Sequence, residues 1–325
     1  MTTEQRVTQM QLRGFTERQA RFLVTVMLHS GVCVARQYGA FAGLAHGRKT
    51  CDFFDGLVDR GYATPRPAGD RRSRIYHVQH KALYRAIGEP DNRHRRPTTL
   101  GRAIERLMIL DAVLADREVG WLATEADKVA YFTLSHRIGR NDLPSATFHG
   151  LETETTRFFP EKLPIGLDPD GRTHVFLYLV ARDTPVDFRA FLERHAELFR
   201  LLPAWKVRLL VPLHKNATVP AYRAAFREHL ASPLRLSVVD ELRWYFRARR
   251  SPDNDTAERF EQAVRAFGAP RFQALHRAWL EHGDVVLDAT LSSTLAEAIG
   301  RGTGSLECHL LPHRYGHLYG LVATA

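Results

Sequence analysis

Cysteine is scarce in this chain of 325 residues, and its three cysteines, Cys33, Cys51 and Cys308, are odd in number and far apart. This usage argues against a disulfide framework and indicates a reducing compartment. Apolar runs are also short, and none approaches the ~18 residues that a membrane-spanning helix requires. The first 15 residues are polar where a secretory signal would be apolar, so we expect a cytoplasmic protein with no membrane partner.

The sequence also lacks the short motifs that mark many catalytic and cofactor sites. It contains no phosphate-binding loop, no GxGxxG after a strand, no GxSxG, no zinc-ligand spacing and no internal repeat. Cys308, His309, His313 and His317 lie close together in the sequence. Metal-binding histidines at i, i+4 spacing would need a helix, and Pro312 and Gly316 argue against one here. We therefore expect neither a metal site here nor a bound cofactor.

The net charge of +10 is distributed unevenly along the chain. Residues 1–100 hold 17 Lys and Arg against 8 Asp and Glu, whereas residues 101–325 hold 29 against 28. A basic segment joined to a nearly neutral body is typical of a protein with a polyanionic partner, and nucleic acid is the commonest such partner. The alternative is a domain whose positive charge serves only solubility.

The basic segment has the element order of a winged helix-turn-helix. Apolar residues at helical spacing predict three helices, over 15–31, 34–45 and 47–61. Two strand-like runs follow, YATP (62–65) and RIYHV (74–78), with a Pro/Gly-rich turn between them. Three helices before a β-hairpin predict a winged helix-turn-helix domain over residues 12–90.

Basic residues gather at two places in that predicted domain. In such folds the third helix enters the major groove by its N-terminal end, so Arg48, Lys49 and Thr50 would face base edges and phosphates. Arginines of the hairpin would contact the DNA backbone or minor groove: Arg66, Arg71, Arg72 and Arg74. Cations at a helix N-terminus oppose its dipole by roughly a few tenths of a kcal/mol each, which indicates a nearby anion. The alternative is a winged helix that contacts protein, with Arg48 and Lys49 merely solvated.

The rest of the chain predicts a mixed-sheet α/β domain. Residues 91–128 are predicted to form a basic linker and a long amphipathic helix. The apolar face of this helix could pack on the second domain or form a dimer interface, and we expect a homodimer. From residue 129 onward, strand-like and helix-like segments alternate. Strands are predicted at 128–134, at two places within 153–183, at 205–212, at 234–240, and as a C-terminal hairpin of 307–311 and 317–323. The predicted fold class is therefore α/β (α+β), with C-terminal helices and a hairpin completing the domain 129–325.

The succession FFPEKLPIGL, a Pro-Asp-Gly turn, THVFLYLVARD, a helix and KVRLLVP resembles the PD-(D/E)XK, restriction-endonuclease-like fold. After a winged helix, it is similar to the replication-relaxation proteins of plasmids and integrative elements and the related mobilisation relaxases, over residues 12–240. This resemblance implies a sequence-specific protein of a mobile or plasmid-like bacterial element that binds double-stranded DNA. A transcription regulator and a replication or transfer accessory factor both fit it.

The nuclease resemblance implies an acid on the second strand and an acid-x-Lys on the third, which hold Mg²⁺ and orient water. Glu161 fits the first position, but residues 176–180 contain neither an acid nor a lysine, and Asp183 comes only at the strand's end. This departure favours an inactive nuclease-like domain that serves as a scaffold or second DNA platform. One alternative is a Mg²⁺-dependent nicking endonuclease or relaxase, with Tyr315 or Tyr319 as a guessed nucleophile; the other is a protein-interaction adaptor. The candidate acids for catalysis are Glu152, Glu154, Glu161 and Asp183.

Overall fold

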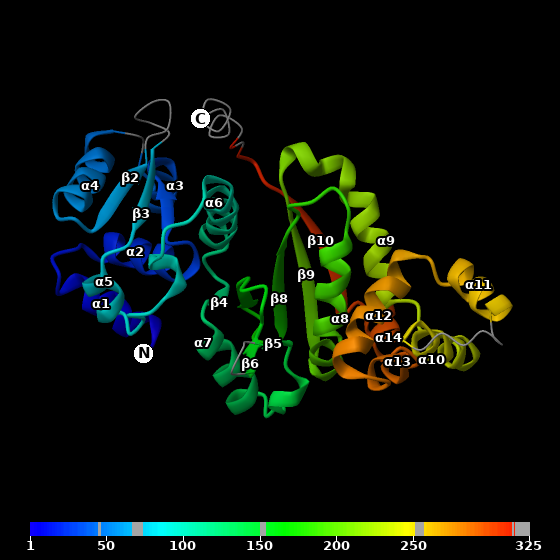
Figure 1. Ribbon diagram of the computed structural model, residues 1–325. Helices are drawn as coiled ribbons and strands as arrows, with labels where there is room; N and C mark the ends of the chain where they lie inside the picture. Colours follow the sequence, from blue (N-terminus) through cyan, green and yellow to red (C-terminus); the bar gives the residue numbers. More distant parts are fainter. Residues whose placement is uncertain (45–46, 67–73, 150–153, 251–256, 314, 316–325) are drawn as a thin grey trace. The chain divides into compact units, whose positions relative to one another are not determined.

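The computed structural model describes residues 1–44, 47–66, 74–149, 154–250, 257–313 and 315 (Figure 1). The chain folds into two compact units. The first unit comprises Met1–Thr124, Leu210–Leu213 and Leu310–Ala325, and the second comprises Glu125–Leu209 and His214–His309. Both units combine helices with strands, and the chain is a mixed α/β protein with a mixed sheet, as its sequence predicts.

The first unit contains the three helices and the hairpin that the sequence predicts, together with α1 and β1, which it does not. Its elements are α1 (Thr3–Gln11), α2 (Glu17–His29), β1 (Val32–Val34), α3 (Ala35–Ala42), α4 (Arg48–Asp59), β2 (Ala63–Arg66), β3 (Ile75–Val78), α5 (Lys81–Ala86), η2 (Arg93–Arg95), α6 (Leu100–Ala115) and β4 (Gly120–Leu122). Thr16 caps α2, because its side chain accepts a hydrogen bond from the Gln19 amide. η2 and α6, predicted as part of a separate linker region, belong to this unit.

A three-stranded antiparallel sheet in the order β1-β3-β2 divides the interior of the first unit. One of its faces packs against the helices, where the ring of Tyr76 stacks on that of Phe54 in α4 with centroids 4.3 Å apart. The opposite face carries His77, whose Nε2 lies 2.8 Å from the carbonyl oxygen of His94 in η2. Successive strand residues alternate between the two faces of the sheet. The register of β2 and β3 therefore decides which side chains lie on the face that contacts α4 and which lie on the face that contacts η2.

The elements from residue 125 onward build a second core. They are α7 (Glu125–Ala130), η3 (Tyr131–Ser135), η4 (Arg140–Asp142), β5 (Ser145–His149), β6 (Glu154–Phe158), β7 (Ile165–Leu167), β8 (Thr173–Leu179), α8 (Val186–Leu201), β9 (Ala204–Val211), η5 (Leu213–Thr218), α9 (Val219–Leu230), α10 (Leu236–Arg250), α11 (Ala257–Ala266), α12 (Pro270–His282), α13 (Val285–Ala289), α14 (Thr294–Gly300) and β10 (Gly304–Leu310). Four sheet strands run in the order β10-β9-β8-β7, and β5 pairs with β6 in a separate hairpin. α8 covers the sheet, with Phe199 stacked on Trp205 of β9 at 4.5 Å between centroids.

Two predicted strands are helical. Residues 128–134 lie in α7 and the π-helical turn η3, and residues 234–240 lead into α10. Short apolar runs suit a buried strand or a buried helix equally well, so their periodicity alone does not decide between the two. In α10 the longer pattern decides, because Val239, Leu242 and Phe246 are buried at spacings of three and four.

The C-terminal region gives one strand of the predicted hairpin. β10 contains most of the segment 307–311, whereas its predicted partner 317–323 lies outside the described residues. The aromatic residues Tyr245 and Phe246 of α10 are buried in the core of the second unit. None of the helices in the described ranges is long and apolar enough to cross a membrane.

Candidate nucleic-acid interface

α4 presents two exposed cations at its N-terminal end. The side chain of Arg48 is 94% exposed, and its nearest carboxylate oxygen, on Asp52, lies 3.9 Å from Nε. Lys49 is exposed beside it. The first turn contains no acidic residue, and its N-cap, Gly47, provides no side-chain oxygen to the free amides. Two exposed cations and the positive end of the helix dipole therefore face solvent together, which suits an anionic partner.

Thr50 does not belong to this exposed surface, and its predicted role as a DNA contact is corrected. Its side chain is fully buried, and its hydroxyl has no hydrogen-bond partner among the described residues. Thr50 precedes Phe53 and Phe54 by three and four residues, so it lies on the same helical face as these core side chains. The helical repeat that buries the two phenylalanines therefore buries Thr50 as well.

The hairpin arginines lie on two different faces of the sheet. Arg66 pairs with Ile75 and follows Thr64 by two residues, so it shares a face with Thr64. Thr64 pairs with His77, so this is the face covered by η2. Arg74 instead hydrogen-bonds to Tyr76, which contacts α4. Burial raises the pKa of the Tyr76 hydroxyl, so Tyr76 stays neutral next to this arginine.

Among the described hairpin arginines, Arg74 therefore lies on the sheet face that contacts α4. Arg66 lies on the opposite face, so the sheet separates it from Arg48 and Lys49. Arg71 and Arg72, at the predicted hairpin tip, lie outside the described residues.

A groove of about 900 Å³ opens beside α4, and it contains cations that the sequence pattern did not reveal. Arg18 of α2 and Arg117 after α6 line it together with Lys49. Arg18 donates to the carbonyl of Ala42 at 3.1 Å, which holds it in place. These arginines are far apart in sequence, and the packing of α2 and of the segment after α6 against α3 brings them together.

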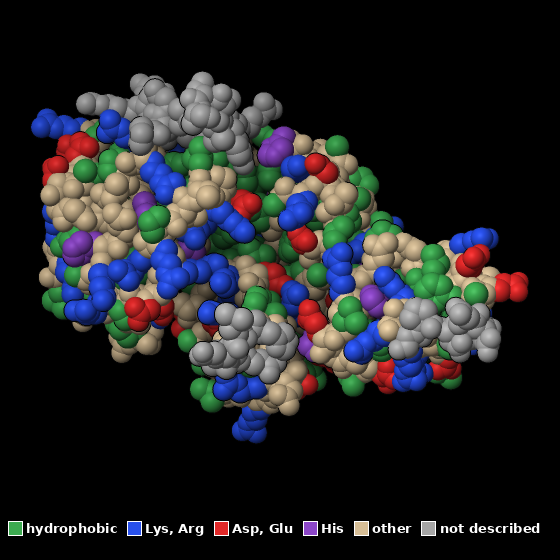
Figure 2. Space-filling view, in the orientation of Figure 1, with side chains coloured by type: hydrophobic (Ala, Val, Ile, Leu, Met, Phe, Trp, Pro, Cys, Tyr) green, Lys and Arg blue, Asp and Glu red, His purple; other side chains and the backbone are tan. Residues whose placement is uncertain are grey.

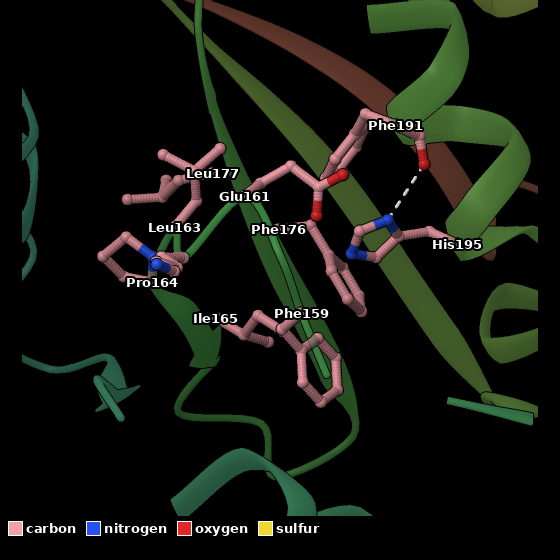
Figure 3. A pocket seen from close by; sticks show the side chains of 10 residues that line it. Phe159, Glu161, Leu163, Pro164, Ile165, Phe176, Leu177, Phe191 and His195 are labelled. Carbon is pink, nitrogen blue, oxygen red and sulfur yellow. Dashed lines mark hydrogen bonds between the residues drawn. The ribbon is translucent and has the colours of Figure 1, made fainter. Parts of the chain in front are cut away.

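Glu161 of the second unit lies in a small pocket lined mostly by apolar side chains (Figure 3). It forms an ion pair with Arg194 of α8, and its second oxygen, Oε2, is buried without a hydrogen-bond partner in the described residues. Figure 3 shows the carboxylate directed toward His195, whose Nδ1 donates to the carbonyl of Phe191 at 2.9 Å. Burial lowers the pKa of His195 to about 4, partly opposed by the charge of Glu161. The enclosed space is about 10 Å³, enough for about one water molecule.

The candidate catalytic acids have separate cationic partners. Asp183 is exposed and accepts a bond of 2.7 Å from Lys215, whereas Glu161 pairs with Arg194. Glu152 lies outside the described residues, and the side chain of Glu154 in β6 does so too. In the described part of the chain, no group of three or more His, Cys, Asp or Glu is arranged to hold a metal ion. A Mg²⁺ ion at Glu161 or Asp183 would have to displace an existing ion pair.

Tyr315, a guessed nucleophile, is buried in the first unit. Its hydroxyl donates to Asp111 Oδ2 at 2.6 Å and also contacts Arg36. Burial raises its pKa, so the nucleophilic phenolate is disfavoured. These contacts give Tyr315 a structural role. Tyr319 lies outside the described residues.

Comparisons with protein-family models, with curated proteins and with solved structures found no match to this chain. Its function must therefore be argued from the arrangement of its own residues.

Proposed function

We propose that the chain binds double-stranded DNA through its first unit, which would be a winged helix-turn-helix domain with α4 as its recognition helix. The element order α2-β1-α3-α4-β2-β3 and the sheet order β1-β3-β2 support this assignment. The observation that carries it is the exposure of Arg48 and Lys49 at one end of α4 while Phe53 and Phe54 are buried further along it.

Phosphate contacts would supply most of the affinity. Arg48 and Lys49 can reach phosphates or base edges from the start of α4, and Arg74 lies at the hairpin on the same side of the sheet. Arg71 and Arg72 would add backbone contacts from the hairpin tip. Arg18 and Arg117 add positive potential to the adjoining groove.

For the second unit we propose an inactive nuclease-like scaffold. The paired states of Glu161 and Asp183 support inactivity, because each carboxylate already has a cationic partner. The whole chain would then be a sequence-specific, dimeric DNA-binding protein of a mobile or plasmid-like element, acting as a transcription regulator or as a replication or transfer accessory factor in the cytoplasm.

A double charge reversal in the full chain tests the role of α4. We expect Arg48→Glu/Lys49→Glu to weaken duplex binding and to lower the slope of log K against log salt by about two, because two phosphate contacts are lost. Fluorescence anisotropy at several salt concentrations measures both quantities, on a duplex obtained by selection from a randomised pool.

The matched control is Arg265→Glu/Arg301→Glu, which changes the net charge equally. Both arginines are exposed and have an i, i+4 glutamate partner, but they lie in the second unit. If the α4 variant keeps the affinity and salt slope of the control, DNA binding through α4 is wrong.

A further inference from the structure

A second group of arginines lies on the first unit, on the sheet face that α4 does not contact. Arg66 comes from β2, Arg93 from η2, and Arg102 and Arg106 from α6. Figure 2 shows Lys and Arg side chains gathered on this unit over α5 and the chain leading into α6. This group, the arginine cluster, is assembled from three segments that the sequence separates by up to 40 positions (from 66 to 106).

Packing against the sheet fixes the position of η2, which carries Arg93. The carbonyl of His94 lies 2.8 Å from His77 Nε2 on β3, and the His94 amide donates to Asn92 Oδ1 at 2.9 Å. His94 itself is buried, with 3% of its surface exposed. The segment around η2, which reads as a flexible linker in the sequence, is therefore docked on the sheet. It holds Arg93 on the same side of the sheet as Arg66.

α6 contributes two arginines to the same place. Arg102 and Arg106 are four residues apart, so they lie on one face of the helix. Thr99 caps this helix by accepting a bond from the Arg102 amide. The side chain of Arg102 is 74% exposed and that of Arg106 is partly buried, so the cluster extends from the protein interior to solvent.

Like charges act on one another within the cluster. Glu105 lies 3.6 Å from Arg102 and is the acid that acts on Arg106. Desolvation is the larger cause that lowers the pKa of Arg106, and the charges of Arg102 and Arg66 lower it further. Arg93 is exposed at the surface, and desolvation, followed by the charges of Arg106 and Arg102, lowers its pKa. The guanidinium groups of Arg102 and Arg66 therefore repel that of Arg106.

One polar atom in the cluster also lacks a partner. Nη1 of Arg106 is buried and makes no hydrogen bond in the described part of the chain. A buried donor without an acceptor is costly, and a charged one more so. An anion entering the cluster would accept this bond and would also screen the repulsion between the arginines.

We propose that Arg66, Arg102 and Arg106 form a phosphate-binding site that engages a nucleic-acid backbone on the opposite sheet face from α4. Guanidinium groups suit phosphate because their planar N–H pairs match two phosphate oxygens. The site itself follows from the cluster; its nucleic-acid ligand rests on the proposed function. A nucleic acid that reaches both α4 and the arginine cluster must bend around the hairpin or present two separate segments.

The test uses the full chain and the variant Arg66→Glu/Arg102→Glu, which spares the partly buried Arg106. We expect duplex binding to weaken about tenfold or more, with the salt slope lowered by about two. The same variant is titrated with inorganic pyrophosphate by calorimetry. Arg66→Lys/Arg102→Lys keeps the charge and should retain most of the salt slope while losing affinity. If the charge reversal fails to fold by circular dichroism, Arg66→Gln/Arg102→Gln replaces it.

The outcomes separate this inference from the role of α4. Weaker duplex binding and a lower slope in the cluster variant support a nucleic-acid ligand, whatever Arg48→Glu/Lys49→Glu does. Loss of pyrophosphate binding with unchanged duplex binding assigns the site to a small phosphate compound and overturns its nucleic-acid ligand. Unchanged binding of both ligands overturns the site, and the proposed function stands if the α4 variant still loses duplex affinity.

Discussion

His195 shows how one buried side chain links the stability of the second unit to pH. It is 2% exposed and surrounded by aromatic rings, with Phe191 at 4.1 Å between centroids. Burial lowers its pKa to about 4, whereas an unfolded chain has the ordinary histidine value of about 6.5. The unfolded state therefore binds the extra proton first as the pH falls, so the folded state loses stability between about pH 6.5 and pH 4.

This loss should reach about 3 kcal/mol at the acid end of the window. We expect His195→Phe, which keeps an aromatic ring in the site, to remove this part of the pH dependence. Urea unfolding of the full chain at several pH values measures it as a flatter profile. His282→Gln, at an exposed histidine, is the control and should keep the original slope. An unchanged slope in His195→Phe would contradict the assignment.

At the level of single residues, the helical repeat of α4 predicts which of its side chains are buried and which are exposed. The pattern that buries Phe53 and Phe54 also predicts a buried Thr50, and only the expectation of a DNA-contacting helix end obscured this. Glu161 could not be assigned in the same way. Its partner, Arg194, is 33 positions away, and no local pattern joins the two.

Among the elements, the segment around η2 differs from its prediction because it is docked on the sheet. A polar, proline-containing stretch is typical of a linker, so the sequence predicts one here. The sequence does not reveal that His94 of this stretch packs against His77 and Gly31. The faces of Arg66 and Arg74 depend likewise on the register between β2 and β3. The sequence predicts that a hairpin exists, but it does not predict the register of its strands. That register decides which arginines lie on the same face of the sheet.

Gly31 tests the docking of this segment. Its φ of +72° lies in the left-handed region, and a Cβ there would lie 2.5 Å from the carbonyl oxygen of His94. We expect Gly31→Ala to cost about 1–2 kcal/mol from the backbone conformation alone, and more from the displaced segment. Thermal unfolding measures the loss.

Gly14→Ala is the matched control for this prediction. Gly14 has a similar φ of +85°, but nothing lies within 4 Å of the Cβ position. It should show only the conformational cost. Equal destabilisation by the two substitutions would mean that the contact with His94 is unimportant.

On the scale of the whole molecule, the first unit includes two segments from late in the sequence, Leu210–Leu213 and Leu310–Ala325. The amide of Leu311 donates to the carbonyl of Val211 at 2.8 Å, and both residues group with residues 1–124. The sequence patterns predict two domains but do not reveal this return, because it depends on contacts between residues that are far apart. The predicted domain 129–325 is therefore interrupted in the structure.

Tyr315 carries the most specific of these late contacts. Asp111 accepts hydrogen bonds from Arg36 at 2.9 Å and 2.8 Å, from Gln37 at 2.8 Å and from the Tyr315 hydroxyl at 2.6 Å. A hydrogen bond to a charged acceptor contributes about 2 kcal/mol. We therefore expect Tyr315→Phe to destabilise the first unit by about that amount.

Hydrogen exchange followed by mass spectrometry locates the effect of Tyr315→Phe. Amides of α3 and α6, which carry Gln37 and Asp111, should exchange faster, whereas those of α8 in the second unit should not change. Tyr62→Phe removes a hydroxyl that Arg60 contacts at 3.3 Å on the exposed surface, so it should have little effect. Wild-type protection of α3 and α6 in Tyr315→Phe would show that the returning chain does not stabilise the first unit, and residues 1–124 would then have to account for its stability without this hydrogen bond.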